Sequence, residues 1–183
     1  MSDFVDYSRS LMDAAKGFRT HAIGLPEGEV KQAFLRAALL HACSFLEAHL
    51  NYMAEHFTEN AMFSMHEQGV LLEKEIRFED GMFILINKLK ISRITDRIDL
   101  LLAKCSSDPV KDKAGWYPDL ASTLKTRNSL VHPKDAHILS ENDVQLALTC
   151  ILKAANKLYS VVFKKGLPYA RKGIDGGLNL ATD

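Results

Sequence analysis

Arg127 and His132 are the two residues whose types and spacing could carry out chemistry together. The guanidinium of an arginine stays charged at physiological pH, whereas an imidazole gains and loses a proton near neutrality. Such a pair suits cleavage of RNA by attack of a ribose 2′-hydroxyl on the adjacent phosphate. The histidine can transfer a proton, and the arginine can stabilise the charge on the pentavalent phosphorus. This reaction requires no metal, and no carboxylates or histidines cluster at metal-ligand spacing, so we expect no metal and no other cofactor.

A helix predicted over residues 118–131 positions Arg127. At about 100° per residue, four of its side chains fall within a sector of roughly 60°: Leu120, Leu124, Arg127 and Val131. We therefore expect this sector to face the core, with Arg127 in its middle. A guanidinium is costly to bury, so a carboxylate, a cleft open to water or a partner subunit must compensate its charge.

Pro133 determines where this helix ends. The residue before a proline is disfavoured in helical conformation, so His132 should leave the helical course. Ending the helix there frees the imidazole to turn back towards Arg127. A purely structural interpretation also exists, in which Arg127 pairs with Glu47 or another acid and His132 interacts with the free carbonyls of the helix end.

Apolar residues at three- and four-residue steps indicate helices along most of the chain. These segments span residues 3–22, 27–57, 92–104, 118–131 and 141–164. Ser92 and Ser140 are the expected N-caps of the third and the fifth. The second segment is apolar on most of its circumference, which is typical of the central helix of a bundle.

Three shorter segments are less regular. Residues 67–76 indicate a further helix, residues 82–86 fit either a short strand or a helix start, and residues 106–115 indicate a polar loop. We predict an all-α, up-and-down helical bundle with a long central second helix. A chain of this length suits one domain, over residues 1–166, followed by a C-terminal tail over residues 167–183.

The segment that contains Arg127 and His132 resembles the signature of the HEPN superfamily, the higher eukaryotes and prokaryotes nucleotide-binding domains. The matching residues are Arg127-Asn128 and, after a spacer of three, His132. A second similarity lies upstream, where residues 42–50 resemble the long helix of several HEPN families. Glu47 stands in the place of their acidic residue. The resemblance covers roughly residues 27–165.

This resemblance implies a homodimer whose two motifs line a shared cleft and cut RNA without a metal. Arg127 and His132 would then be catalytic, Asn128 would shape the site, and Glu47 would hold Arg127 in position. Some HEPN toxins carry a tyrosine two residues after the histidine, which a partner enzyme modifies. Lys134 stands at that position here, so nucleotide transfer to such a tyrosine by a partner enzyme is not expected.

Three functions fit these residues. The first is a metal-independent endoribonuclease of toxin or phage-defence type, with an antitoxin or another regulatory protein as partner. The alternative is a non-catalytic HEPN module that dimerises and binds RNA, a nucleotide or a protein. The third is a helical interaction protein in which the motif only supports the fold.

Charge and cysteine content constrain the partners and the compartment. The 183 residues include 23 Lys and Arg and 23 Asp and Glu, so the net charge is zero. A broad basic surface is therefore not expected, and any RNA recognition should be local. Three scattered cysteines favour a reducing compartment. The N-terminal residues do not resemble a signal peptide, and no run of about 18 apolar residues occurs, so we expect a cytoplasmic protein without membrane association.

Other notable side chains have structural interpretations. His41 and His49 lie on the apolar second helix and are interpreted as core or boundary residues. Trp116 is interpreted as a core anchor. Arg93 and Arg97, with neighbouring lysines, are interpreted as solvated helix faces, of which one could contact phosphate.

Overall fold

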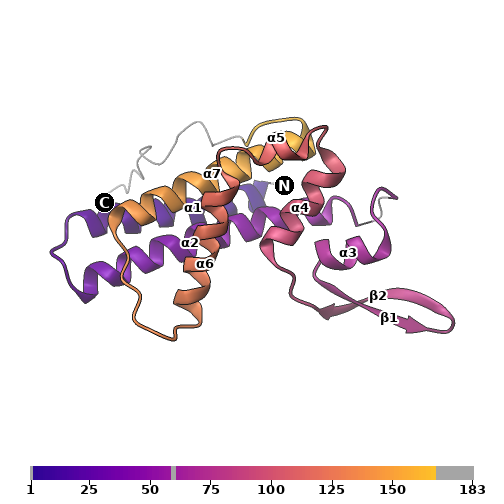
Figure 1. Cartoon of the computed structure of the whole chain (residues 1–183), viewed down its shortest axis with the longest axis horizontal. Coiled ribbons are helices and arrows are strands. Elements are labelled where there is room, and N and C mark those ends of the chain that lie inside the picture. The colour runs from indigo at the N-terminus through magenta and orange to yellow at the C-terminus, as the bar shows by residue number, and fades with distance from the viewer. Residues whose placement is uncertain (1, 59–60, 168–183) are drawn as a thin grey trace.

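Helices account for nearly all the regular structure of this protein (Figure 1). The computed structural model describes residues 2–58 and 61–167. The helices are α1 (Ser2–Ile23), α2 (Glu29–Glu55), α3 (Met65–Leu71), α4 (Ile94–Cys105), α5 (Pro109–Lys113), α6 (Tyr117–Val131) and α7 (Glu141–Phe163). The strands are β1 (Lys74–Glu79) and β2 (Met82–Leu89). The predicted all-α bundle and its long second helix are confirmed. Apart from Leu167, which is buried, the predicted tail lies outside the described residues.

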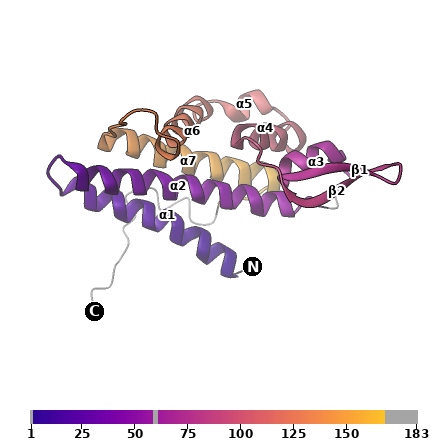
Figure 2. The same cartoon turned by 90° about the horizontal axis from the view of Figure 1, so that it is seen from below.

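α2 lies at the centre of the bundle. α1 packs along one side of it, while α7 and the layer of α4, α5 and α6 lie on other sides (Figure 2). Large side chains on more than one face of α2 are fully buried, among them Leu39, Phe45, Leu46, Leu50 and Met53. Removing this apolar surface from water is the main favourable contribution to folding. The wide apolar arc seen in the sequence therefore packs against several helices at once.

α2 and α7 run parallel to each other. Near the start of α2, the buried Gln32 amide makes two hydrogen bonds of 2.9 Å with the backbone of Leu139, just before α7. Near the other end, the rings of Tyr52 and Tyr159 stack, and His56 contacts Phe163. Two parallel helices need a long crossover connection between them, and residues 56–140 form that connection. Elements of this crossover, together with α2, form the site described below.

A β-hairpin projects from the bundle between α3 and α4 (Figure 1). β1 and β2 pair antiparallel around Asp80-Gly81, whose φ angles are both positive, at 49° and 82°. Asp-Gly suits the tight hairpin turn that requires this conformation at both positions. The helix expected over residues 67–76 was therefore wrong beyond Leu71, and the short strand considered over residues 82–86 belongs to β2.

Two further expectations on the crossover were wrong. The N-cap of α4 is Arg93 and not Ser92, whose N–H instead donates to the Glu73 carboxylate at 3.0 Å. The segment expected as a polar loop contains α5, which begins at Pro109. By contrast Trp116 is buried as predicted, and its indole N–H donates to the backbone at 2.7 Å.

α7 is a core helix of the bundle. Its start is confirmed, because Ser140 and Asp143 cap each other's backbone in a reciprocal capping box. Within the described residues it is the one helix long and apolar enough to cross a membrane by length and composition, with a mean hydropathy of 1.4. More than half of that window, 56%, is buried inside the bundle, as in a core helix of a soluble protein.

Candidate functional site

An open cleft of about 1180 Å³ lies between the end of α6, the start of α4 and the C-terminal half of α2. The end of β2 and the loop after α6 complete its rim. All four site residues predicted from the sequence line this cleft: Glu47, Arg127, Asn128 and His132. Residues up to 85 positions apart in the chain are thus brought together, as the resemblance implied.

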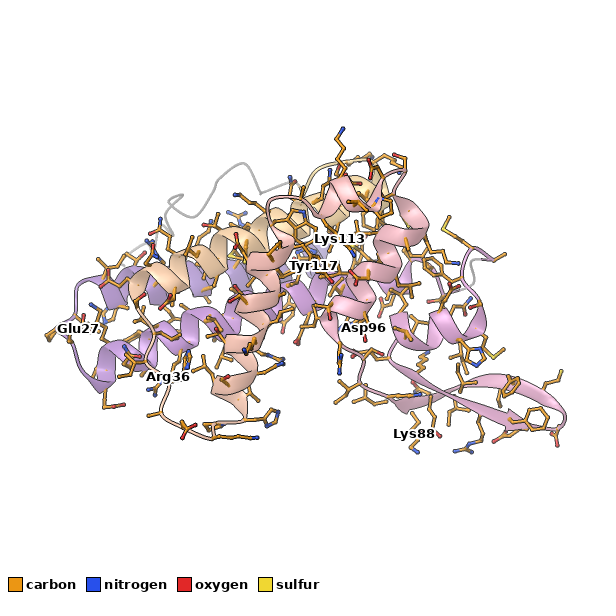
Figure 3. All side chains as sticks on the ribbon, in the orientation of Figure 1. Glu27, Arg36, Lys88, Asp96, Lys113 and Tyr117 are labelled. Atoms are coloured by element: carbon orange, nitrogen blue, oxygen red, sulfur yellow. The ribbon has the colours of Figure 1, made fainter. Side chains whose placement is uncertain are left out.

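α6 crosses α2 at a steep angle (Figure 1). Arg127, near the end of α6, is only partly buried. At the start of α6, the Tyr117 ring lies beneath the Lys113 ammonium, 4.8 Å from ring centroid to Nζ (Figure 3). In its middle, Leu120 and Leu124 are buried. The expectation that Val131 also faces the core was wrong, because its side chain is 45% exposed. In the last turn of α6 Leu130 packs against the core, and Val131, about 100° further round the helix, faces away from it.

Arg127 is held by two neighbours. Its Nη2 donates to Glu47 Oε1 at 2.6 Å in an ion pair, and its Nη1 donates to Asn128 Oδ1 at 3.1 Å. Two of the three compensations considered for this cation therefore occur, a carboxylate and an open cleft. The side chain is 29% exposed. A guanidinium has five N–H groups in a rigid fork, so N–H groups remain for a ligand in the cleft.

His132 ends α6 as predicted. Its backbone is no longer helical, with φ −125° and ψ 66°. Its backbone N–H still donates to the Asn128 carbonyl oxygen at 2.9 Å. The imidazole is exposed, and within residues 2–58 and 61–167 it has no hydrogen-bond partner. The loop that follows is tied to α2 at Leu139 by the two bonds to Gln32. His132 thus stands on an anchored loop with both ring nitrogens available.

Arg97 is a second arginine of the same cleft, which sequence reasoning missed. The interpretation as part of a solvated helix face was wrong, because this side chain is only 3% exposed. Its Nη1 pairs with Glu73 at 3.2 Å, and its Nη2 donates to Asn51 at 2.7 Å. Burial lowers the pKa of Arg97, while the charges of Glu73 and Glu47 oppose that shift.

The sequence did contain a signal for Arg97. Ile94, Arg97, Ile98 and Leu101 recur at three- and four-residue steps on α4. This is the same anomaly of a cation within an apolar sector that pointed to Arg127. Asn51 lies one turn after Glu47 on the same face of α2. Successive turns of the central helix therefore bind the two arginines, Glu47 binding Arg127 and Asn51 binding Arg97.

The cleft concentrates positive charge on a chain whose net charge is zero. Its lining includes five lysines and arginines against three carboxylates, together with His132 and His137. Arg93, Lys125 and Lys134 are exposed, and among the described residues none of the three forms an ion pair. Local cationic surface of this kind favours anions such as phosphates.

The neighbouring cysteine and histidines are structural. Cys43 is buried near Arg127, and desolvation raises the pKa of its thiol to about 12, so it stays protonated. Cys43 and Cys150 are both free and buried. His41 Nδ1 donates to the Ala37 carbonyl oxygen at 2.9 Å, and the His49 ring is enclosed by aromatic rings. In the part of the chain that the structure describes, no three His, Cys, Asp or Glu residues group as metal ligands.

Comparison of the chain with protein-family models, with curated proteins and with solved structures finds no match. The resemblance to the HEPN superfamily therefore stays a prediction from the sequence, based on Arg127, Asn128, His132 and Glu47, which the fold brings into one cleft.

Proposed function

We propose that this protein is a metal-independent endoribonuclease of the toxin or phage-defence type. The observation that carries the proposal is Arg127, held between Glu47 and Asn128 at the edge of a cationic cleft that His132 also lines. The cation is oriented yet partly exposed, and the imidazole is free. Phosphodiester cleavage needs a positioned cation to stabilise the phosphoryl charge and an accessible imidazole to transfer a proton.

In the proposed reaction His132 removes the proton from a ribose 2′-hydroxyl. The 2′-oxygen forms a bond to the adjacent phosphorus, and the bond from phosphorus to the 5′-oxygen breaks. Arg127 stabilises the charge on the phosphoryl oxygens, which is greatest in the pentavalent state. The products are a 2′,3′-cyclic phosphate and a free 5′-hydroxyl.

The departing 5′-oxygen needs a proton, and this need supports a homodimer. One motif supplies one imidazole, which holds the 2′-hydroxyl proton at the moment the second bond breaks. A second copy of the motif in a shared cleft would supply the acid. Sedimentation equilibrium should then give the mass of two chains.

Glu47 serves as a positioning residue in this proposal. Its carboxylate orients the Arg127 fork across two helices, and Asn128 steadies the fork from the same turn of α6. An arginine fork fixed before the substrate arrives loses little entropy when it binds phosphate. An antitoxin or another regulatory protein that covers the cleft would be the expected partner of such an enzyme.

A second candidate is a non-catalytic module that dimerises and binds RNA, a nucleotide or a protein partner. The observation that favours it is the state of His132, because no acceptor among the described residues orients its ring. Catalytic histidines are commonly held in one tautomer by such a bond. Binding that survives His132→Ala, with no turnover by the parent protein, would identify this function.

Cleavage of RNA in the presence of EDTA tests the first proposal. Arg127→Ala and His132→Ala should each lower the cleavage rate by about 10²-fold or more, because each removes a group that acts in the transition state. Products should end in 2′,3′-cyclic phosphate. Arg36→Ala and His66→Ala are matched controls outside the cleft, and Figure 3 shows Arg36 far along α2 from the hairpin. Equal cleavage by all four variants, or no cleavage of any RNA, would contradict the proposal.

A further inference from the structure

The wall of the cleft opposite α6 differs from α6 in its residue types, because it combines exposed aliphatic side chains with an arginine. Leu89 at the end of β2 and Ile91 just after it are 71% and 82% exposed, although both are large aliphatic residues. Arg93 follows at the start of α4 and is exposed as well. All three line the cleft, and we call them, with the first turn of α4, the α4 wall. In Figure 3 the labelled Lys88 and Asp96 mark the two ends of this segment.

The start of α4 offers backbone N–H groups to the cleft that have no acceptor among the described residues. Arg93 is the N-cap of this twelve-residue helix, and its side chain makes no capping bond to the first turn. The N–H groups of a first turn have no partner within the helix and carry partial positive charge. Ile94 and Thr95, the first residues of that turn, line the cleft.

Arg97 adds a second, independent observation. This buried guanidinium lines the same cleft one turn further along α4. Its Nη atoms are bound to Glu73 and Asn51, but its Nε is buried and has no hydrogen-bond acceptor among the described residues. A buried donor without an acceptor is costly to the fold. Because this Nε is enclosed by the protein, Arg97 acts on the cleft through the charge of its guanidinium and not through a bond from Nε to a ligand.

These features differ in kind from those around Arg127. The α4 wall combines exposed aliphatic surface with a cation and helix-terminal donors, whereas the end of α6 offers polar and charged groups. A ligand matched to the wall has an apolar face and an anionic group close together. A nucleotide of single-stranded RNA has both, because an unstacked base exposes its face beside the phosphate.

We propose that the α4 wall binds the nucleotide next to the scissile phosphate, with its base on Leu89 and Ile91 and its phosphate on Arg93. This inference rests on the proposed function and extends it, because it makes the substrate a single strand that crosses the cleft from α6 to α4. The cleft has room for this, since about 1180 Å³ exceeds the roughly 300–1000 Å³ typical of sites for one small ligand.

Direct binding to a labelled, single-stranded oligoribonucleotide tests the inference without cleavage. His132→Ala serves as the background, so that the RNA stays intact. In this background Arg93→Ala should weaken binding about tenfold. It should also make the slope of log affinity against log salt shallower by about 0.7, the value for one lost phosphate contact on a single strand. Ile91→Ser should weaken binding about fivefold and leave the salt slope unchanged, because it removes only apolar contact with a base.

Lys88→Ala is the matched control. Lys88 is a neighbouring cation on β2 that pairs with Glu75 at 2.7 Å and does not line the cleft. Its loss should change the affinity less than twofold. Melting temperatures of all variants should stay within a few degrees of the background, because the substituted side chains are exposed.

The outcomes separate this inference from the ribonuclease proposal. If Arg93→Ala and Ile91→Ser bind RNA as tightly as the background, the α4 wall is not the subsite, even where the parent protein cuts RNA. If both variants bind more weakly while the parent cuts no RNA, the α4 wall is an RNA-binding subsite of a non-catalytic module, and the ribonuclease proposal falls. If the background protein binds no single-stranded RNA, the inference is overturned.

Discussion

An arginine and a histidine occur in each of two regions of this molecule, and the two pairs differ mainly in exposure. In the interior, Arg97 on α4 is 3% exposed and His49 on α2 is buried among aromatic rings. At the end of α6, Arg127 is 29% exposed and His132 is open to solvent. Both arginines pair with a glutamate and contact an asparagine.

The comparison shows how burial assigns different roles to the same residue types. A buried ion pair is held tightly, and removing one partner leaves an uncompensated charge in the interior. A partly exposed pair contributes little to stability, but its cation can exchange one contact for a ligand. Arg97 therefore joins α2, α4 and the base of the hairpin, whereas Arg127 is placed where phosphate can reach it.

The largest expected effect is the loss of stability in Arg97→Ala. This substitution leaves the Glu73 carboxylate and the Asn51 amide without their partner inside the cleft wall. We expect the free energy of unfolding to fall by about 3–5 kcal/mol, as measured by urea denaturation. A loss below about 1 kcal/mol would mean that Arg97 and Arg127 are equivalent, and the comparison would fail.

His49 provides the next test, through pH. Burial lowers the pKa of His49 from 6.5 to about 4. At a pH between these two pKa values, the imidazole is therefore protonated in the unfolded chain and neutral in the folded protein. The stability that depends on neutral His49 is therefore complete above about pH 6.5 and is lost as the pH falls towards 4. Between pH 7.5 and 4.5 the loss should be about 2–3 kcal/mol in urea denaturation.

His49→Leu should remove this part of the acid sensitivity, because leucine does not titrate. The control is His66→Ala, since His66 is exposed on α3. An unchanged pH profile in His49→Leu would show that His49 does not distinguish the interior from the cleft.

The smallest expected effect is that of Arg127→Ala on stability. Its ion pair with Glu47 is partly exposed on both sides, so its removal should change the free energy of unfolding by less than about 1 kcal/mol. The same variant should lose cleavage activity, which separates function from stability. A change as large as that of Arg97→Ala would favour a structural role for the motif.

Much of the helical frame could be predicted from the sequence because its signals are local. The wide apolar arc of α2, the Ser140 cap and Pro133 after His132 each act within a few residues. The contact between Glu47 and Arg127, 80 positions apart, was expected from the resemblance and occurs. The hairpin was missed in part because the apolar run over residues 82–86 is too short to tell a strand from a helix, although Asp80-Gly81 indicates a tight turn.

The sequence by itself determined that Arg97 and Arg127 each interrupt an apolar sector of a helix, and that His132 ends one. Only the tertiary structure decided which arginine is buried. α4 is covered along this sector by α2 and the hairpin base, so Arg97 is enclosed. α6 crosses α2 steeply and its last turn passes the edge of the core, so Arg127 and His132 reach a cleft. Helical periodicity sets the direction of a side chain, but the crossing of helices sets what it meets.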